Sequence, residues 1–279
     1  MILIADCGGT KSDWCLVNRG TVTYRFIGAG INAAVINDVD ALAGIFESVK
    51  TQLSHHDTIS NIFYYGAGAT GTSALLITEL LKNVFPFTAV EVSTDMLGAA
   101  RSLCGNRPGI AAILGTGSNS CYYDGRIITS NTPPLGYILG DEGSGASMGK
   151  ALINGIFKQL FSRGIIEAFN SHYNLNLDEI ITKVYREPNA NAYLASFAIF
   201  ISKHRKKPEI KGLIENCFSQ FFERNIMQYP EHGEVPMHAV GSVAWHFKEE
   251  LHHVAKLRGI HLATVQQSPM PGLIKFHSR

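Results

Sequence analysis

One pattern occurs twice in this chain: a short apolar run, a turn rich in Gly and Thr, and a second run of strand-forming residues. The first copy starts at Ile2 and turns at Gly8–Lys11, and the second starts at Ile110 and turns at Gly115–Gly117. Each copy predicts a β-hairpin that begins with a buried strand. Glycine lets backbone N–H groups approach an anion closely, so both turns are candidate phosphate-binding sites. An ordinary hairpin turn is the alternative for the first copy.

The first turn carries a hydroxyl and two charges. Thr10 offers a donor and Lys11 a positive charge, whereas the carboxylate of Asp6 would repel a phosphate. A magnesium ion that keeps its waters could lie between the Asp6 carboxylate and a phosphate. This combination makes a nucleotide site as reasonable an interpretation as a plain turn.

Strands and helices alternate through the first third of the chain. Leu42–Leu53 has apolar residues at helical spacing, and Ile62–Tyr65 is a predicted strand. Alternation of this kind predicts parallel pairing in an α/β sheet, where ligands collect at the carboxyl ends of the strands. Asp6, Gly66 and Asp95 all lie at such predicted ends.

The turn-rich segment Gly105–Gly109 is the best candidate for a domain boundary. We therefore predict an N-terminal domain over residues 1–108 and a C-terminal domain over 109–268, followed by a closing helix within 269–279. The stretch 163–230 is predicted to be mostly helical and carries no chemical motif.

Composition disfavours several classes of function. The 279 residues are 17% charged with a net charge of +1, which provides no general attraction to nucleic acid or to an anionic membrane. No apolar run approaches the ~20 residues of a membrane span. The five cysteines contain no C-x-x-C pair and the 11 histidines no zinc motif, which indicates a cytoplasmic protein without disulfides. P-loop, Rossmann and nucleophile-elbow patterns are also missing.

Phosphoryl transfer needs a base that orients the attacking hydroxyl, in addition to groups that hold the phosphates. Asp95 ends a predicted strand outside both turns, so its carboxylate could position a sugar hydroxyl and accept its proton. Asp95 could equally be the N-cap of the helix that starts at Met96. Asp141 has a similar alternative, because carboxylates are favoured at the N-terminus of a helix.

Five short motifs occur along the chain in a particular order. They are Asp6-Cys-Gly-Gly-Thr-Lys11, Thr94-Asp95, Leu114-Gly-Thr-Gly-Ser-Asn119, Leu139-Gly-Asp-Glu-Gly-Ser144 and Val240-Gly-Ser-Val243. Together they resemble the N-acetylglucosamine kinase family, a group of BadF/BadG/BcrA/BcrD-type ATPases in the actin and hexokinase superfamily. The resemblance implies two ribonuclease-H-like, actin-like ATPase domains of α/β class with a cleft between them, and a closing helix that packs on the first domain. It also implies transfer of phosphate from ATP, with Mg²⁺, to the 6-hydroxyl of N-acetylglucosamine.

The resemblance assigns roles to individual residues as well. Asp95 would be the catalytic base, and Asp6 would contact the magnesium ion through water. The ATP-binding residues would be Gly8, Gly9, Thr10, Lys11, Gly115, Thr116, Gly117, Gly241 and Ser242. The sugar-binding residues would be Asn32, Asp95, Ser118, Asn119, Gly136 and Asp141. Animal members carry a tryptophan and a glycine-rich loop where this chain has Pro133–Gly136, so the contact with the N-acetyl group stays open.

Two other functions stay open. One is an ATPase that activates an iron–sulfur dehydratase or reductase, which needs cysteine thiolates such as those of Cys104 and Cys121. The other is a sugar sensor without catalytic activity. The choice of sugar and the oligomeric state are open too, a homodimer being one option.

Overall fold

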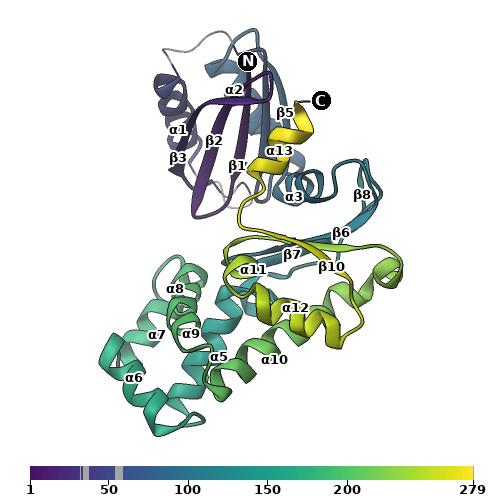
Figure 1. Cartoon of the computed structure of the whole chain (residues 1–279). Helices are drawn as coiled ribbons and strands as arrows, with labels where there is room; N and C mark the ends of the chain where they lie inside the picture. Colours follow the sequence, from purple (N-terminus) through teal and green to yellow (C-terminus); the bar gives the residue numbers. More distant parts are fainter. Residues whose placement is uncertain (32, 34–37, 54–58, 279) are drawn as a thin grey trace. The chain divides into compact units, whose positions relative to one another are not determined.

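Two five-stranded mixed sheets organise the chain (Figure 1), which confirms the predicted α/β class. The computed structural model describes residues 1–31, 33, 38–53 and 59–278. Contacts divide the chain into two units. Unit 1 consists of Met1–Arg107, Gly125–Ile127 and Pro269–Arg279, and unit 2 of Pro108–Asp124 and Ile128–Ser268.

The sheet of unit 1 has the strand order β3-β2-β1-β4-β5. Its strands are β1 (Ile2–Cys7), β2 (Lys11–Asn18), β3 (Thr21–Ala29), β4 (Asn61–Gly66) and β5 (Ala89–Thr94). The first three form an antiparallel meander, whereas β4 and β5 continue the sheet in parallel with β1. The carboxyl ends of β1, β4 and β5 therefore lie at one edge.

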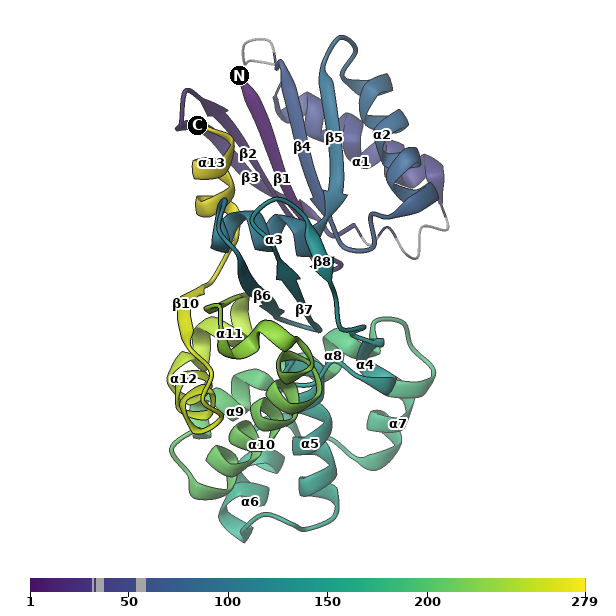
Figure 2. The ribbon, with the colours of Figure 1, turned by 90° about the vertical axis from the view of Figure 1, so that its right-hand side faces the viewer.

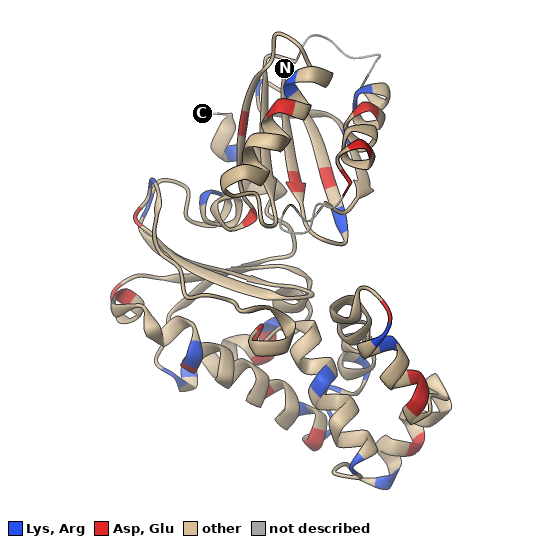
Figure 3. Cartoon of the chain, turned by 180° about the vertical axis from the view of Figure 1, so that it is seen from behind, with Lys and Arg blue, Asp and Glu red and all other residues tan. Residues whose placement is uncertain are grey.

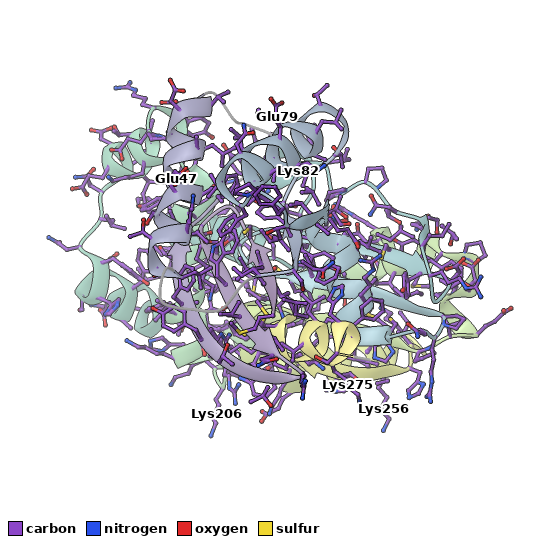
Figure 4. All side chains as sticks on the ribbon, turned by 90° about the horizontal axis from the view of Figure 1, so that it is seen from above. Glu47, Glu79, Lys82, Lys206, Lys256 and Lys275 are labelled. Carbon is purple, nitrogen blue, oxygen red and sulfur yellow. The ribbon has the colours of Figure 1, made fainter. Side chains whose placement is uncertain are left out.

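Helices cover both faces of this sheet. On one face α1 (Val39–Gln52) and α2 (Gly71–Val84) pack over a core that contains Trp14, and on the other α13 (Met270–His277) packs beside α3 (Asp95–Cys104). Figure 4 shows Glu47, Glu79 and Lys82, of α1 and α2, on the side opposite to Lys275 of α13.

The residues of β1 alternate between these two faces. Leu3, Ala5 and Cys7 belong to the core under α1 and α2, and Ile4 belongs to the core under α13. Because side chains alternate along a strand, Asp6 lies on the face that α3 and α13 cover. This placement decides which groups surround its carboxylate.

The sheet of unit 2 has the strand order β10-β9-β6-β7-β8. Its strands are β6 (Gly109–Leu114), β7 (Ser118–Tyr123), β8 (Ile128–Ser130), β9 (Met237–Val240) and β10 (Leu262–Gln266). None of the five strands carries a Lys, Arg, Asp or Glu, and Figure 3 shows them uniformly tan. Charged residues of this unit lie on its helices and loops instead.

The large core of unit 2 lies between its sheet and the helices gathered on one side of it (Figure 2). The helices are α4 (Gly136–Leu139), α5 (Gly145–Phe157), α6 (Arg163–Tyr173), α7 (Leu177–Tyr185), α8 (Ala190–Ser196), α9 (Ala198–His204), α10 (Pro208–Arg224), α11 (Ser242–His246) and α12 (Lys248–Leu257), with short 3₁₀ turns at Ile226–Gln228 and Pro230–Gly233. Across the described part of the chain, no helix has both the length and the hydrophobicity of a membrane span.

Helices α5 and α8 approach each other closely at one glycine. A Cβ atom on Gly149 of α5 would overlap the carbonyl oxygen of Leu194 in α8. Because that oxygen belongs to the backbone, rotation of a side chain cannot relieve the overlap. The packing of this helix pair therefore depends on the absence of a side chain at Gly149.

Gly149→Ala should lower the free energy of unfolding by about 1–3 kcal/mol, because the added methyl group forces α5 and α8 apart. The matched control is Gly212→Ala in α10, where nothing lies within 4 Å of the added atom. That control should raise stability by about 0.5–1 kcal/mol through helix propensity alone. Urea denaturation of both variants measures the difference, and a stabilised Gly149→Ala would contradict the packing argument.

Candidate functional site

The turn between β1 and β2 is held by backbone groups from a later segment. The N–H of Gly8 donates to the carbonyl of Lys11 (3.0 Å) within the turn, and the N–H of Ile31 donates to the carbonyl of Gly8 (3.0 Å). A Cβ on Gly30 would lie 2.5 Å from the carbonyl oxygen of Gly9 and from the carbonyl carbon of Thr10. The segment after β3 thus lies directly against the turn, while Gly9, Thr10 and Lys11 are exposed.

Gly30 was not among the residues predicted to form the site. The sequence contains only a weak signal for Gly30, which lies two residues before the predicted sugar contact Asn32. Its contact with the turn is long-range and becomes visible only in the folded chain. Asn32 itself lies outside the described residues.

Carboxylates gather near the end of β1. Asp6 is the cross-strand partner of Asp13, whose carboxylate accepts two hydrogen bonds from Arg25 (2.9 and 2.6 Å). Burial, followed by the negative charges of Asp95 and Asp13, raises the pKa of Asp6 from 3.8 to about 7, against the opposing effect of Lys11. The charge of Asp95 is therefore close enough to contribute to the raised pKa of Asp6.

Asp95 is the first residue of α3 and lies at the carboxyl end of β5. The N-cap is Thr94, whose hydroxyl oxygen accepts a hydrogen bond from the N–H of Leu97 (3.1 Å). The Asp95 carboxylate accepts a hydrogen bond from the N–H of Met96 (2.8 Å). Burial raises the pKa of Asp95, and this hydrogen bond partly offsets the rise. Thr94, and not Asp95, is therefore the N-cap of α3.

The carboxylates of unit 1 fit a magnesium ion that is held mainly by water and phosphate. In the described ranges, no group of three or more His, Cys, Asp or Glu residues could hold a metal ion by itself. Asp13 already pairs with Arg25, which leaves Asp6 as the carboxylate beside the first turn. A cation there would offset the burial and the charge repulsion that together raise the pKa of Asp6. Mg²⁺ commonly binds in this way, through one or two carboxylates plus substrate phosphates.

The second glycine turn, in unit 2, is also held through its backbone. Within the turn, the N–H of Gly115 donates to the carbonyl of Gly117 (2.9 Å). From the start of α5, the N–H of Gly145 donates to the carbonyl of Gly115 (2.8 Å) and that of Ala146 to the carbonyl of Thr116 (3.1 Å). The first turn of α5 therefore fixes the position of the glycine turn.

Gly241 brings a third segment to the same edge of this sheet. It follows β9, which pairs in parallel with β6, and a Cβ at Gly241 would overlap the carbonyl oxygen of Leu114 at the end of β6. Its N–H donates to the carbonyl of Gln266 (3.0 Å), and α11 begins at Ser242. The predicted ATP-binding residues of unit 2 are thus neighbours in space.

The predicted sugar-binding residues of unit 2 are arranged around Asp141. The Asp141 carboxylate accepts a hydrogen bond from the N–H of Ser118 (3.3 Å), and its own N–H donates to the carbonyl of Pro134 (3.0 Å). Asp141 is buried with a left-handed φ of 56°, and burial raises its pKa. The N-cap of α5 is Ser144, so Asp141 does not cap that helix.

The other two predicted sugar contacts of unit 2 are less closely connected with Asp141. The side-chain oxygen of Asn119 accepts a hydrogen bond from Asn131 (2.9 Å), and Gly136 starts α4 on the exposed surface. The structure thus joins Ser118 and Asp141 through a hydrogen bond and puts Asn119 next to Ser118 along β7.

Comparison with family models and with curated proteins finds no match. Among solved structures, a candidate N-acetylglucosamine kinase from Porphyromonas gingivalis is 44% identical to this chain and has a TM-score of 0.96, over 100% of this chain and 99% of its own. A candidate N-acetylglucosamine kinase from Chromobacterium violaceum is 18% identical, with a TM-score of 0.77 over 99% of both chains.

A glucokinase of the ROK family from Streptomyces griseus, solved with glucose and AMPPNP, has a TM-score of 0.57 at 13% identity, over 99% of this chain and 97% of its own. The two distant structures share the fold. The protein from Porphyromonas gingivalis also shows the family, because its 44% identity extends over the whole length of this chain. This chain belongs to the N-acetylglucosamine kinase family of actin-like ATPases.

Proposed function

We propose that the protein is an ATP-dependent sugar kinase that phosphorylates N-acetylglucosamine at its 6-hydroxyl. The observation that carries this proposal is that Asp6, at the end of β1, and Asp95, directly after β5, lie at the carboxyl ends of parallel strands of one sheet, the edge that carries the first glycine turn. The likeness to a candidate N-acetylglucosamine kinase supports the choice of an amino sugar.

In the proposed reaction the phosphates of ATP contact Thr10 and Lys11 from the first turn and Thr116 from the second. The sugar hydroxyl gives its proton to the carboxylate of Asp95 while its oxygen attacks the γ-phosphorus. The bond from that phosphorus to the bridging oxygen breaks, and ADP leaves with the electron pair. Asp6 would hold Mg²⁺ through water, and the ion, when bound, would neutralise part of the phosphate charge.

Two carboxylates are the main sugar contacts in this proposal. Asp95 would contact the reacting hydroxyl, and Asp141 would accept hydrogen bonds from others. Asn32, Ser118, Asn119 and Gly136 complete the proposed sugar-binding set.

The raised pKa of the Cys104 thiol argues against the iron–sulfur alternative. Burial raises the pKa of Cys104 to about 12, so this thiol does not ionise readily. Iron–sulfur clusters are held by thiolates, and Cys104 is a poor source of one.

Asp95→Asn should reduce kcat for sugar phosphorylation by about 10²–10⁴-fold, because the amide cannot accept the proton. ATP affinity, measured by isothermal titration calorimetry, should stay within about twofold, because Asp95 lies outside both glycine turns. The matched control is Asp40→Asn, an exposed position in α1, which should leave kcat unchanged.

The assay is ADP release with N-acetylglucosamine, glucosamine, N-acetylmannosamine and glucose as separate acceptors. The largest kcat/KM is expected with N-acetylglucosamine. ADP release that does not depend on any sugar would refute the kinase proposal, and a preference for glucose would refute the choice of an amino sugar.

Asp6→Asn should abolish activity and yet stabilise the fold at neutral to alkaline pH. The raised pKa of Asp6 means that the folded state binds a proton more tightly than the unfolded state, so the ionised carboxylate costs stability as pH rises from about 4 to about 7. We expect Asp6→Asn to be more stable than wild type by up to roughly 4 kcal/mol at pH 8, since each pKa unit corresponds to about 1.4 kcal/mol, and equally stable at pH 3.5. Urea denaturation without Mg²⁺ at both pH values tests this, and equal stability at pH 8 would contradict it.

Gly30→Ala should raise KM for ATP on the order of 10²-fold, because the methyl group displaces the first turn by about 1 Å. KM for the sugar and the midpoint of thermal unfolding should stay unchanged if the substitution affects only nucleotide binding. The control Gly44→Ala, in α1, adds the same methyl group where nothing lies within 4 Å. An unchanged KM for ATP in Gly30→Ala would show that the turn does not hold the phosphates.

A further inference from the structure

The chain has two tryptophans with opposite environments. Trp14 is fully buried in the core of unit 1, whereas Trp245 is 38% exposed. Trp245 belongs to α11, the helix that starts directly after Gly241. Its backbone N–H donates to the carbonyl of Gly241 (3.0 Å), so the indole lies one helical turn from that glycine.

Helix α11 has one buried and one exposed side. Val243 and Ala244 are part of the core of unit 2, whereas Ser242 and Trp245 are exposed. Residues three apart on a helix lie on the same face. The indole of Trp245 and the hydroxyl of Ser242 therefore share a surface that begins at the edge where Gly241 contacts Leu114.

Lys248 covers part of the indole. Its ammonium nitrogen lies 4.8 Å from the centre of the Trp245 ring, a cation–π distance that favours a fixed ring orientation. With Lys248 over the ring, Trp245 is still 38% exposed, so part of the indole surface is open to a planar group. Flat aromatic rings next to a phosphate site are typical platforms for nucleotide bases.

We propose that Trp245 stacks on the adenine ring of ATP. This inference rests on the proposed function, in which Gly241 and Ser242 contact the nucleotide. The base lies on the indole face opposite Lys248, and the ribose lies near Ser242. From there the phosphates extend past Gly241 toward the turn at Gly115–Gly117.

Tryptophan fluorescence tests the stacking in the wild-type protein. Iodide, a quencher that reaches exposed side chains, should act on Trp245 and leave the buried Trp14 unaffected. ADP should lower the emission and protect it from iodide at least twofold. Inorganic tripolyphosphate carries no base and should give neither effect, even where it competes with ADP in calorimetry.

Substitutions then separate stacking from a structural role. Trp245→Leu should raise KM for ATP about tenfold with kcat and the sugar KM unchanged. Trp245→Phe keeps an aromatic face and should restore most of the affinity. The control His246→Leu alters the next exposed residue of α11 and should have no effect.

Two results would overturn the inference, and they have different meanings. If ADP binds by calorimetry while iodide quenching is unchanged and Trp245→Leu keeps its KM for ATP, the stacking is wrong and the proposed function stands. If no adenine nucleotide binds at all, both the inference and the proposed function are wrong.

Discussion

Backbone contacts to the two glycine turns are the constraint on which the candidate site depends. A turn that is to donate N–H groups to phosphates cannot be positioned by its own side chains, because it has almost none. In unit 1 the turn is held by Ile31 and lies against Gly30, and in unit 2 it is held by Gly145 and Ala146 of α5. Each turn is therefore as rigid as the element behind it, which preorganises the donors for an anion.

Close approach between backbones also explains two glycines of unit 2. Gly149 allows α5 to approach α8, and Gly241 allows the end of β9 to contact the end of β6. The first contact sets the position of α5, whose N-terminus holds the turn at Gly115–Gly117. The second places α11 beside that turn. Packing at some distance from the site thus determines its geometry.

Without a cation, the buried carboxylates of unit 1 lower the stability of the folded state at neutral pH. Asp6 has a pKa of about 7 because it is buried near Asp95 and Asp13. Such an arrangement reduces stability at neutral pH, and a protein that had only to fold would do better with an amide at this position. A strongly raised carboxylate pKa next to a turn suited to phosphate is instead a common property of functional sites.

Much of the architecture followed from the sequence, because local rules govern it. Alternating strand and helix patterns predicted the α/β class, and strands that end in glycines predicted hairpin turns at Gly8–Lys11 and Gly115–Gly117, which the structure contains. Parallel pairing also implied that Asp6 and Asp95 end at one edge of a sheet. These inferences need only hydrophobic periodicity and the conformational preferences of glycine.

Tertiary structure decided what the sequence left open. From the sequence, Asp95 and Asp141 could each have been a helix N-cap. In the structure Thr94 caps α3 and Ser144 caps α5. Gly30 and Trp245 lie outside every motif: Gly30 contacts a turn that is distant in the chain, and Trp245 is exposed on the helix that follows Gly241. The sequence by itself determined the fold class and the residue types available for phosphoryl transfer. Only the folded chain decided which of those residues meet, because long-range packing, unlike hydrophobic periodicity, leaves no local pattern in a single sequence.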